Sequence, residues 1–216
     1  MDIDRPASPA LPLAPAEYSA GAQNQLTSVL RLFFNRLTGT LNALLSRDNG
    51  SGIGGGAALY FPRGQIYART TQSVSVINTP TRVVFDTAYS MNGMTFVTGD
   101  GIHVQVGGVF NVQFSVQLTN ADSQIHDVDV WLRKNGVDFA DSASVTSVPN
   151  SHGGQPGYMV MAANFLIELA AGDYIEFWWS SNSTQVQMNY LPAITTPFTS
   201  PGAPAFVVTM TFVSNI

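Results

Sequence analysis

The chain has 216 residues, of which only 11% are charged, well below the roughly 25% usual in soluble domains. The net charge is −5 and lysine and arginine form no cluster, which argues against nucleic-acid binding, because phosphate contacts need concentrated positive charge. The absence of cysteine excludes disulfides, thiolate zinc sites and cysteine nucleophiles. A surface so poor in charge is typical of a β-protein that belongs to a large assembly.

The first 22 residues predict an extended arm. Prolines recur there at every third position, at Pro6, Pro9, Pro12 and Pro15, which favours a polyproline-like backbone. The arm is either a disordered tail or a peptide that docks along another protein. Acids and prolines stand where a signal peptide would need a basic start and an apolar run, and no stretch reaches the roughly 18 apolar residues of a membrane helix. We therefore expect synthesis in a cytosol and no membrane insertion.

Residues 23–46 predict one amphipathic helix. Apolar side chains recur there at steps of three and four, at Leu26, Val29, Leu30, Phe33, Leu37, Leu41 and Leu44. With no helical partner in the chain, this face must dock on the β-domain, associate with copies of itself or bind another protein, and we favour the last two. The residues expected to anchor the chain to a partner are Leu11, Leu13, Tyr18, Leu26, Leu30, Phe33, Phe34 and Leu37.

A glycine-rich linker follows the helix at residues 48–56. It resembles a phosphate-binding loop in glycine content, but no Gly-Lys-Ser/Thr follows and no strand and helix frame it. We therefore divide the chain into a proline-rich arm at 1–22, a helix at 23–47, a linker and transition at 48–69, and a β-domain at 70–216.

Strict alternation of apolar and polar residues predicts two strands in the middle of the β-domain. From Phe110 to Leu118 every second residue is apolar, so one face of this strand points into a core. Residues 128–132 repeat the pattern. Asn135-Gly136 then predicts a type I′ hairpin turn, because both central residues of that turn need positive φ. This region is therefore antiparallel sheet with one buried face.

The rest of the β-domain predicts further strands, about eight to ten in all, with turns at the spacing of a sandwich or jelly roll. Between residues 158 and 169 the apolar phase changes near Ala163-Asn164, so we expect a bulge there. Two long loops interrupt the strands, at residues 148–157 and 191–204.

Short motifs in a characteristic order resemble the C1q/tumour-necrosis-factor-like jelly roll over roughly residues 70–216. They are Val83-Val84-Phe85-Asp86, Gly101-Ile102-His103-Val104, Gly108-Val109-Phe110-Asn111-Val112, Val130-Trp131-Leu132-Arg133-Lys134-Asn135-Gly136, Leu169-Ala170-Ala171-Gly172-Asp173-Tyr174-Ile175-Glu176, and the strand from Phe206 to Phe212. The final strand lacks the family's usual glycine near its end. Members of the family are typically trimers, so the resemblance implies a mainly β, antiparallel jelly-roll sandwich and a homotrimer.

The N-terminal part resembles the leader of small virion proteins of tailed bacteriophages, in which a proline-rich arm and a helix precede a β-domain. The segments that carry this resemblance are Leu13-Ala14-Pro15-Ala16-Glu17-Tyr18, Gln25-Leu26 and the run from Leu30 to Leu37. It implies a viral protein that is assembled into a virion in the host cytoplasm.

Aromatic residues supply an independent reason to expect subunit contacts. Trp178 and Trp179 are neighbours on one strand, so their side chains point to opposite faces and only one of them can fill the core. The other would join Trp131, Tyr174 and Phe177 in an aromatic surface that a monomer leaves wet. Unless a loop covers this surface, we expect a trimer interface formed by Trp131, Tyr174, Trp178 and Trp179.

The sequence gives little support for catalysis or for a metal ion. The three histidines are far apart, and none has a ligand partner at metal-site spacing. Asp122, Asp127 and Asp129 would suit calcium, although a solvated turn is the simpler interpretation. No Gly-x-Ser-x-Gly elbow is present, and Glu168 and Glu176 lie in predicted strands. We therefore expect no enzyme activity, no catalytic residue and no cofactor.

The favoured function is a structural virion protein: a trimeric short tail fibre that is anchored by its arm and helix and whose jelly roll contacts a host-surface glycan or protein. The close alternative is a capsid decoration or cement protein that stabilises the head. A free lectin-like binding module is the second alternative. The residues expected to contact a receptor lie in or beside the two long loops and are Asn150, His152, Gln155, Tyr190 and Phe198.

Overall fold

The computed structural model describes residues 9–13, 16–45, 61–97 and 101–215. The chain divides into two units, Met1–Tyr60 and Phe61–Ile216. In the described part of the chain, the first unit contains one helix, α1 (Ala20–Leu45), and the second contains the strands. The predicted fold class, a mainly β antiparallel sandwich preceded by one helix, is confirmed. The glycine-rich linker predicted at 48–56 lies outside the described residues.

Helix α1 begins three residues before its predicted start, because Ser19 caps it. The Ser19 hydroxyl oxygen accepts a hydrogen bond from the Ala22 backbone N–H at 3.3 Å, which satisfies one of the free donors at the helix start. The helix has 26 residues and is therefore about 39 Å long. Its half-buried positions form a stripe at steps of three and four residues, at Ala22, Leu26, Val29, Leu30, Phe33, Leu37 and Thr40.

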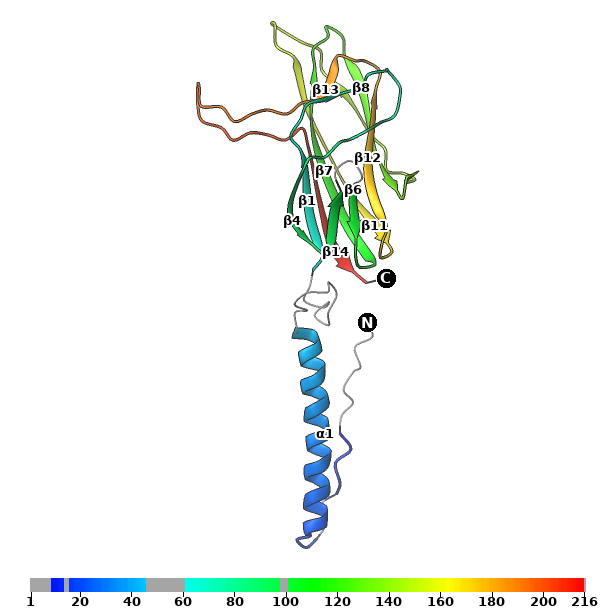
Figure 1. Cartoon of the computed structure of the whole chain (residues 1–216), viewed down its shortest axis with the longest axis vertical. Coiled ribbons are helices and arrows are strands. Elements are labelled where there is room, and N and C mark those ends of the chain that lie inside the picture. The colour runs from blue at the N-terminus through cyan, green and yellow to red at the C-terminus, as the bar shows by residue number, and fades with distance from the viewer. Residues whose placement is uncertain (1–8, 14–15, 46–60, 98–100, 216) are drawn as a thin grey trace. The chain divides into compact units, whose positions relative to one another are not determined.

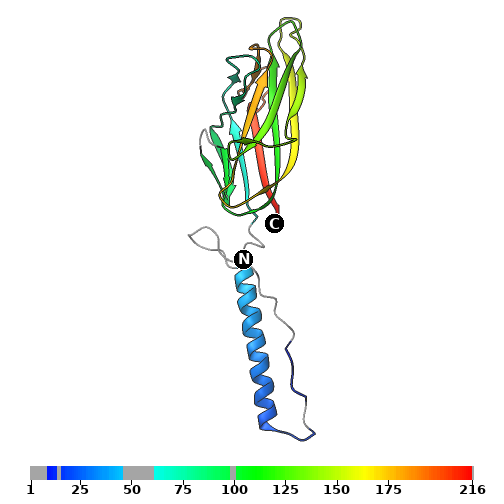
Figure 2. The same ribbon diagram turned by 90° about the vertical axis from the view of Figure 1, so that its right-hand side faces the viewer.

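The second unit is built from two antiparallel sheets. The strands are β1 (Arg63–Ala68), β2 (Gln72–Ser73), β3 (Thr81–Arg82), β4 (Thr87–Asn92), β5 (Met94–Val97), β6 (Gly101–Val104), β7 (Gly108–Asn120), β8 (His126–Lys134), β9 (Val137–Asp138), β10 (Ser144–Val148), β11 (Gly157–Leu169), β12 (Tyr174–Ser181), β13 (Val186–Met188) and β14 (Phe206–Ser214). Figures 1 and 2 show the long strands of both sheets running along the same axis of this unit.

The first sheet has the strand order β2-β13-β7-β14-β1-β4, with β11 also paired to β7. Strands β13 and β14 follow one another along one side of β7, so β11 occupies its other side. The β7–β11 ladder is continuous from Gly108↔Leu169 to Asn120↔Gly157. Among the described residues β11 pairs with no second strand, so it forms an edge of the sheet.

The second sheet has the order β10-β8-β12-β6-β5, with β3 paired to β12 and β9 paired to β8. Along the described strands, the chain passes from one sheet to the other eight times: between β2 and β3, β3 and β4, β4 and β5, β6 and β7, β7 and β8, β10 and β11, β11 and β12, and β12 and β13. These crossings set the two sheets face to face around a shared core, rather than building each sheet from consecutive hairpins.

The core between the sheets is centred on aromatic rings. Phe177 of β12 lies 6.1 Å from Phe85, 5.4 Å from Phe114 and 5.2 Å from Phe206, measured between ring centroids. Phe114 and Phe206 belong to the first sheet and Phe177 to the second, so the cluster joins the two layers. The predicted inward residues of β7 and β8 are all buried: Phe110, Val112, Phe114, Val116, Leu118, Val128, Val130 and Leu132.

Two boundaries within the sandwich differ from the sequence prediction. The segment expected to be a linker and transition up to residue 69 contains β1, which pairs with both β14 and β4. Two of its three inward positions are Gly64 and Ala68, which carry too little apolar surface to give a strand signal. The β-unit therefore starts at Phe61 rather than at residue 70.

The bulge predicted in β11 is absent, and the ladder with β7 runs through Ala163 and Asn164 without a shift. The prediction was wrong because it placed Val160 and Ala162 in the core, whereas both side chains are exposed. The inward residues of β11 are Met159, Met161, Ala163, Phe165, Ile167 and Leu169, in one unbroken alternation. Strand β11 thus carries apolar residues on both faces.

The predicted Asn135-Gly136 turn is confirmed. Asn135 has φ 53° and Gly136 has φ 78°, and Lys134 pairs with Val137 across the turn from β8 to β9. Both residues occupy the left-handed region that a type I′ turn requires, which asparagine and glycine tolerate best.

Candidate interaction surface

The edge strand β11 of the first sheet turns a row of apolar side chains outward. On β11, Tyr158, Val160 and Leu166 point away from the core and are 55%, 55% and 67% exposed. They share this face with Ala162, so four of the six outward positions of the edge strand are apolar. Clustered apolar side chains of this kind mark an interaction surface more often than a solvated one.

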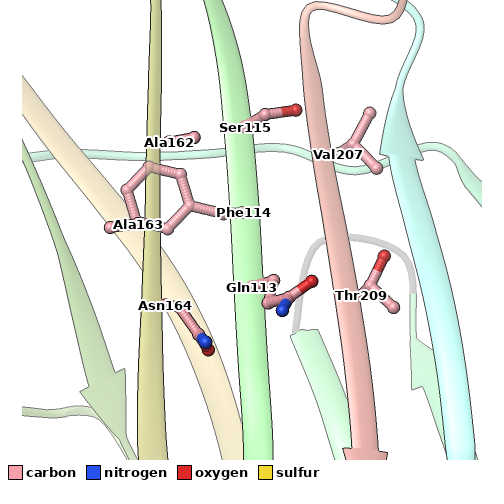
Figure 3. A pocket seen from close by; sticks show the side chains of 8 residues that line it. All are labelled: Gln113, Phe114, Ser115, Ala162, Ala163, Asn164, Val207 and Thr209. Atoms are coloured by element: carbon pink, nitrogen blue, oxygen red, sulfur yellow. The ribbon is translucent and has the colours of Figure 1, made fainter.

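A shallow hollow of about 510 Å³ lies on the same face, across β11, β7 and β14. Figure 3 shows its lining: three side chains from each of β11 and β7 and two from β14. They are Gln113, Phe114, Ser115, Ala162, Ala163, Asn164, Val207 and Thr209. None is charged, and small residues at the centre leave room for an inserted apolar side chain.

The outward positions of the three strands carry almost no charge. Alternation along β7 and β14 turns only valine, threonine, serine, asparagine and glutamine outward, and Glu168 is the one charged outward residue on β11. The face can therefore lose its water without burying unpaired charges, whose desolvation would be costly.

The outer face of the second sheet differs, because the chain's own polar groups cover its aromatic residues. The Arg133 guanidinium carbon lies 3.8 Å from the centroid of the Trp178 ring, a cation–π contact. The imidazole of His103 stacks on Tyr174 with 4.9 Å between centroids. Arg82 pairs with the buried Glu176 at 3.0 Å.

This arrangement corrects part of the predicted trimer interface. Trp179 has 0% exposure and lies in the core of the single chain, and Phe177 is buried with it. Trp131, Tyr174 and Trp178 are half-buried on the outer face, as predicted, but side chains of the same subunit already contact them. Their part in an interface stays a prediction.

Asp138 holds two of the side chains on the outer face of the second sheet, Arg133 and Trp131, in position. Its Oδ1 accepts hydrogen bonds from Arg133 Nε at 2.6 Å and from Trp131 Nε1 at 2.7 Å. These bonds, with Arg133 the larger cause, lower the pKa of the Asp138 carboxyl from its ordinary value of 3.8. The ionised carboxylate is therefore favoured in the folded chain.

We expect Asp138→Asn to lower the free energy of unfolding at pH 7. Because the carboxyl pKa is depressed in the fold, its stabilising effect is complete above the unfolded value of 3.8 and is lost as pH falls through the folded value. The gap between wild type and variant in urea unfolding should therefore close in acid. Asp129→Asn, on the same face of β8, is the control; a gap that persists unchanged in acid would contradict this account.

The two predicted receptor loops have different structures. In the first, His152 and Gln155 form a tight turn with paired backbone hydrogen bonds of 2.9 and 3.0 Å, and Asn150 is exposed beside it. In the second, residues 191–203 form a protruding hairpin with Phe198, 64% exposed, near its tip and the half-buried Tyr190 at its root.

A polar cluster beside the first loop was not predicted. His126 lies 2.7 Å from Asp122 Oδ2 through Nε2 and 3.2 Å from Asn182 Oδ1 through Nδ1. The hydrogen bond from His126 is the main reason that the pKa of the Asp122 carboxyl is lowered. Asp122 lies four residues before His126, whereas Asn182 is 56 residues away from it, and the pairing of β8 with β12 brings Asn182 to the histidine. The cluster ties the loops at this end of the sandwich together.

The predicted anchoring residues lie in the first unit. Leu26, Leu30, Phe33 and Leu37 belong to the half-buried stripe of α1, whereas Phe34 is 56% exposed and lies beside it. Leu11, Leu13 and Tyr18 are all exposed, Leu13 at 96%. Pro12 and Leu13 line one hollow of about 280 Å³ together with Tyr18, which precedes the helix, and Leu26 within the helix.

Within the described residues, no group of His, Asp and Glu side chains is arranged to hold a metal ion. No described helix is both long enough and apolar enough to cross a bilayer. The sequence matches no known family model, and no curated protein is detectably similar to it.

Proposed function

We propose that this chain is a trimeric structural virion protein of a tailed bacteriophage, most consistent with a short tail fibre. In this proposal the sandwich is the assembling and exposed part, and the N-terminal unit attaches the trimer to the particle. The observation that carries the proposal is the outer face of β11, β7 and β14, which carries almost no charge and bears exposed apolar side chains on β11. Such a face needs a partner that is equally poor in charge, and an identical subunit provides one.

The strand order supports the jelly-roll part of the proposal. The long strands of the first sheet run β1-β14-β7-β11 and those of the second β10-β8-β12-β6. The first and last strands of the sandwich are thus neighbours, and along these eight strands the chain changes sheet at every step except from β8 to β10. This is the connectivity expected for a double-sheet jelly roll, the fold that the sequence motifs resemble.

The separate N-terminal unit supports an anchoring role. The exposed leucines of residues 9–13 and the apolar stripe of α1 offer side chains for another protein or for copies of the same helix. Helix α1 lacks an acidic residue in its first turn and a basic residue in its last, so a lone helix gains little from its dipole. Burial of the stripe against a partner would supply the missing stability.

A fragment that begins at Ala57 is expected to stay folded and to lose its attachment to particles. It keeps every strand of the sandwich, since the β-unit starts at Phe61, but it lacks the arm and α1. Thermal unfolding by circular dichroism and co-sedimentation with virions of the same phage measure the two properties. Incorporation at the full-length level would refute the anchoring role, and an unfolded fragment would refute the independence of the sandwich.

A capsid decoration or cement protein is the second candidate, because the exposed N-terminal residues would equally suit a peptide that lies across neighbouring shell subunits. Copy number separates the two functions: tens of chains per particle for a fibre and hundreds for cement. Quantitative mass spectrometry of purified virions supplies this number. In the fibre, the loop that carries Asn150 is the place for contact with a host surface.

A further inference from the structure

The connection from β13 to β14 forms a hairpin that stands away from the sandwich. Leu191 pairs with Ala203, and Ile194 pairs with Ser200, through four backbone hydrogen bonds of 2.8 to 3.0 Å. Every residue from 191 to 199 is exposed. In Figure 1 this lateral hairpin, residues 191–203, is drawn in orange and leaves the β-unit sideways, across the direction of the long strands.

The lateral hairpin is held in shape by its own sequence. A β-carbon at Gly202 would lie 2.9 Å from the Leu191 carbonyl oxygen and 3.1 Å from the Ala193 nitrogen, so a larger residue would force the two limbs apart. Pro192, Pro197 and Pro201 restrict the backbone further. At the root, Thr71 Oγ1 accepts a hydrogen bond from the Tyr190 backbone N–H at 3.1 Å. An isolated hairpin is only marginally stable in water, and these restraints reduce the entropy lost when it binds.

The chemistry of the hairpin points to an uncharged partner. No charged residue occurs between Leu191 and Ala205. The exposed side chains include Leu191, Ile194 and, near the tip, Phe198 at 64% exposure. An apolar projection without charge gains most by entering a surface that is also uncharged, because neither side then loses hydration of an ion.

The same chain carries such a surface. The hollow on the outer face of the first sheet has about 510 Å³, an uncharged lining and the exposed Val160 and Leu166 on the strand that forms its edge. Each limb of the hairpin has about six residues and so spans roughly 20 Å. That length carries Phe198 well clear of its own sandwich, toward a subunit placed at its side.

We propose that the lateral hairpin of each subunit lies on the outer face of the first sheet of the next subunit, with Phe198 in the hollow. This inference rests on the proposed trimer. The contact joins two different surfaces, and contacts of that type generate a closed ring when the rotation between subunits is 120°. Three hairpins and three hollows would then all be used, and no apolar hairpin would remain in water.

The test is photo-crosslinking in the purified full-length protein, with Phe198 replaced by the photoreactive residue benzoylphenylalanine. We expect covalently joined chains, with the attached peptide drawn from β7, β11 or β14. The control carries the same replacement at Ile125, which is 62% exposed in a different loop, and should yield separate chains. Mass spectrometry of the digest identifies the crosslinked peptides.

The outcomes separate this inference from the proposed function. A trimer in which residue 198 crosslinks to another surface, to its own chain or to nothing would overturn the hairpin contact and leave the trimer standing. A chain that stays monomeric at all concentrations would overturn both. As a second readout, Phe198→Ser is expected to weaken association at least tenfold while leaving the circular dichroism spectrum unchanged, because loss of a central aromatic anchor typically costs that much.

Discussion

Ala162→Arg is expected to convert the trimer into monomers. The side chain at this position is exposed, borders the hollow on the outer face of the first sheet and lies opposite Ser115 of β7. An arginine would fill the hollow and place one charge per subunit in a contact that has no acidic partner, and burying an unpaired ion costs several kcal/mol. Sedimentation equilibrium should show the mass of one chain, 23.1 kDa, where the wild type shows three times that mass.

The matched control for this substitution is Val145→Arg. Val145 is 64% exposed on β10, in the second sheet, so the same charge is added to a face that the proposal leaves free. We expect this variant to remain trimeric, and both variants to keep the wild-type circular dichroism spectrum. A trimeric Ala162→Arg protein would show that the subunits meet on another surface. A monomeric wild type would remove the trimer from the proposal.

Phe177→Ala is expected to lower the free energy of unfolding by about 3 to 5 kcal/mol. The Phe177 ring of the second sheet is 2% exposed and contacts Phe114 and Phe206 of the first sheet, so its removal leaves a cavity at the centre of the sandwich. Urea unfolding at one fixed protein concentration measures the change, since association of the chains adds to apparent stability. Tyr89→Ala, at a 62% exposed position of β4, should change the value by less than about 0.5 kcal/mol. Equal effects at the two sites would contradict the placement of the core.

Strong periodicity made the centre of the fold predictable. The alternation from Phe110 to Leu118 and the Asn135-Gly136 turn each fix a backbone geometry from local sequence alone. Strand β1 could not be found in this way, because Gly64 and Ala68 face inward in it with almost no apolar side chain. Its place in the sheet is decided by pairing with β14, nearly 150 residues later in the chain, for which the sequence offers no local signal.

The candidate surface shows where pattern analysis fails for a physical reason. Val160 and Ala162 are apolar, so an interpretation that sends every apolar residue inward needs a bulge in β11 to accommodate them. The ladder has no bulge, and the two residues are exposed because the strand is apolar on both faces. The change in the apolar alternation of β11 was therefore caused by the exposed apolar residues of the candidate surface, not by a bulge. The two neighbouring tryptophans led to the converse problem. Trp178 was predicted to need another subunit to cover it, but Arg133 of the same chain already covers its ring.

The position of β1 also determines how the sandwich would respond to mechanical tension. A pull on the chain ahead of residue 61 would act along this strand, whose six residue pairs with β14 and four with β4 lie on its two sides. Hydrogen bonds between antiparallel strands run perpendicular to the strand axis, so such a force shears both ladders at once instead of unzipping them bond by bond. The chain ahead of residue 61 is thus joined to the sandwich through a strand whose pairing resists mechanical extension.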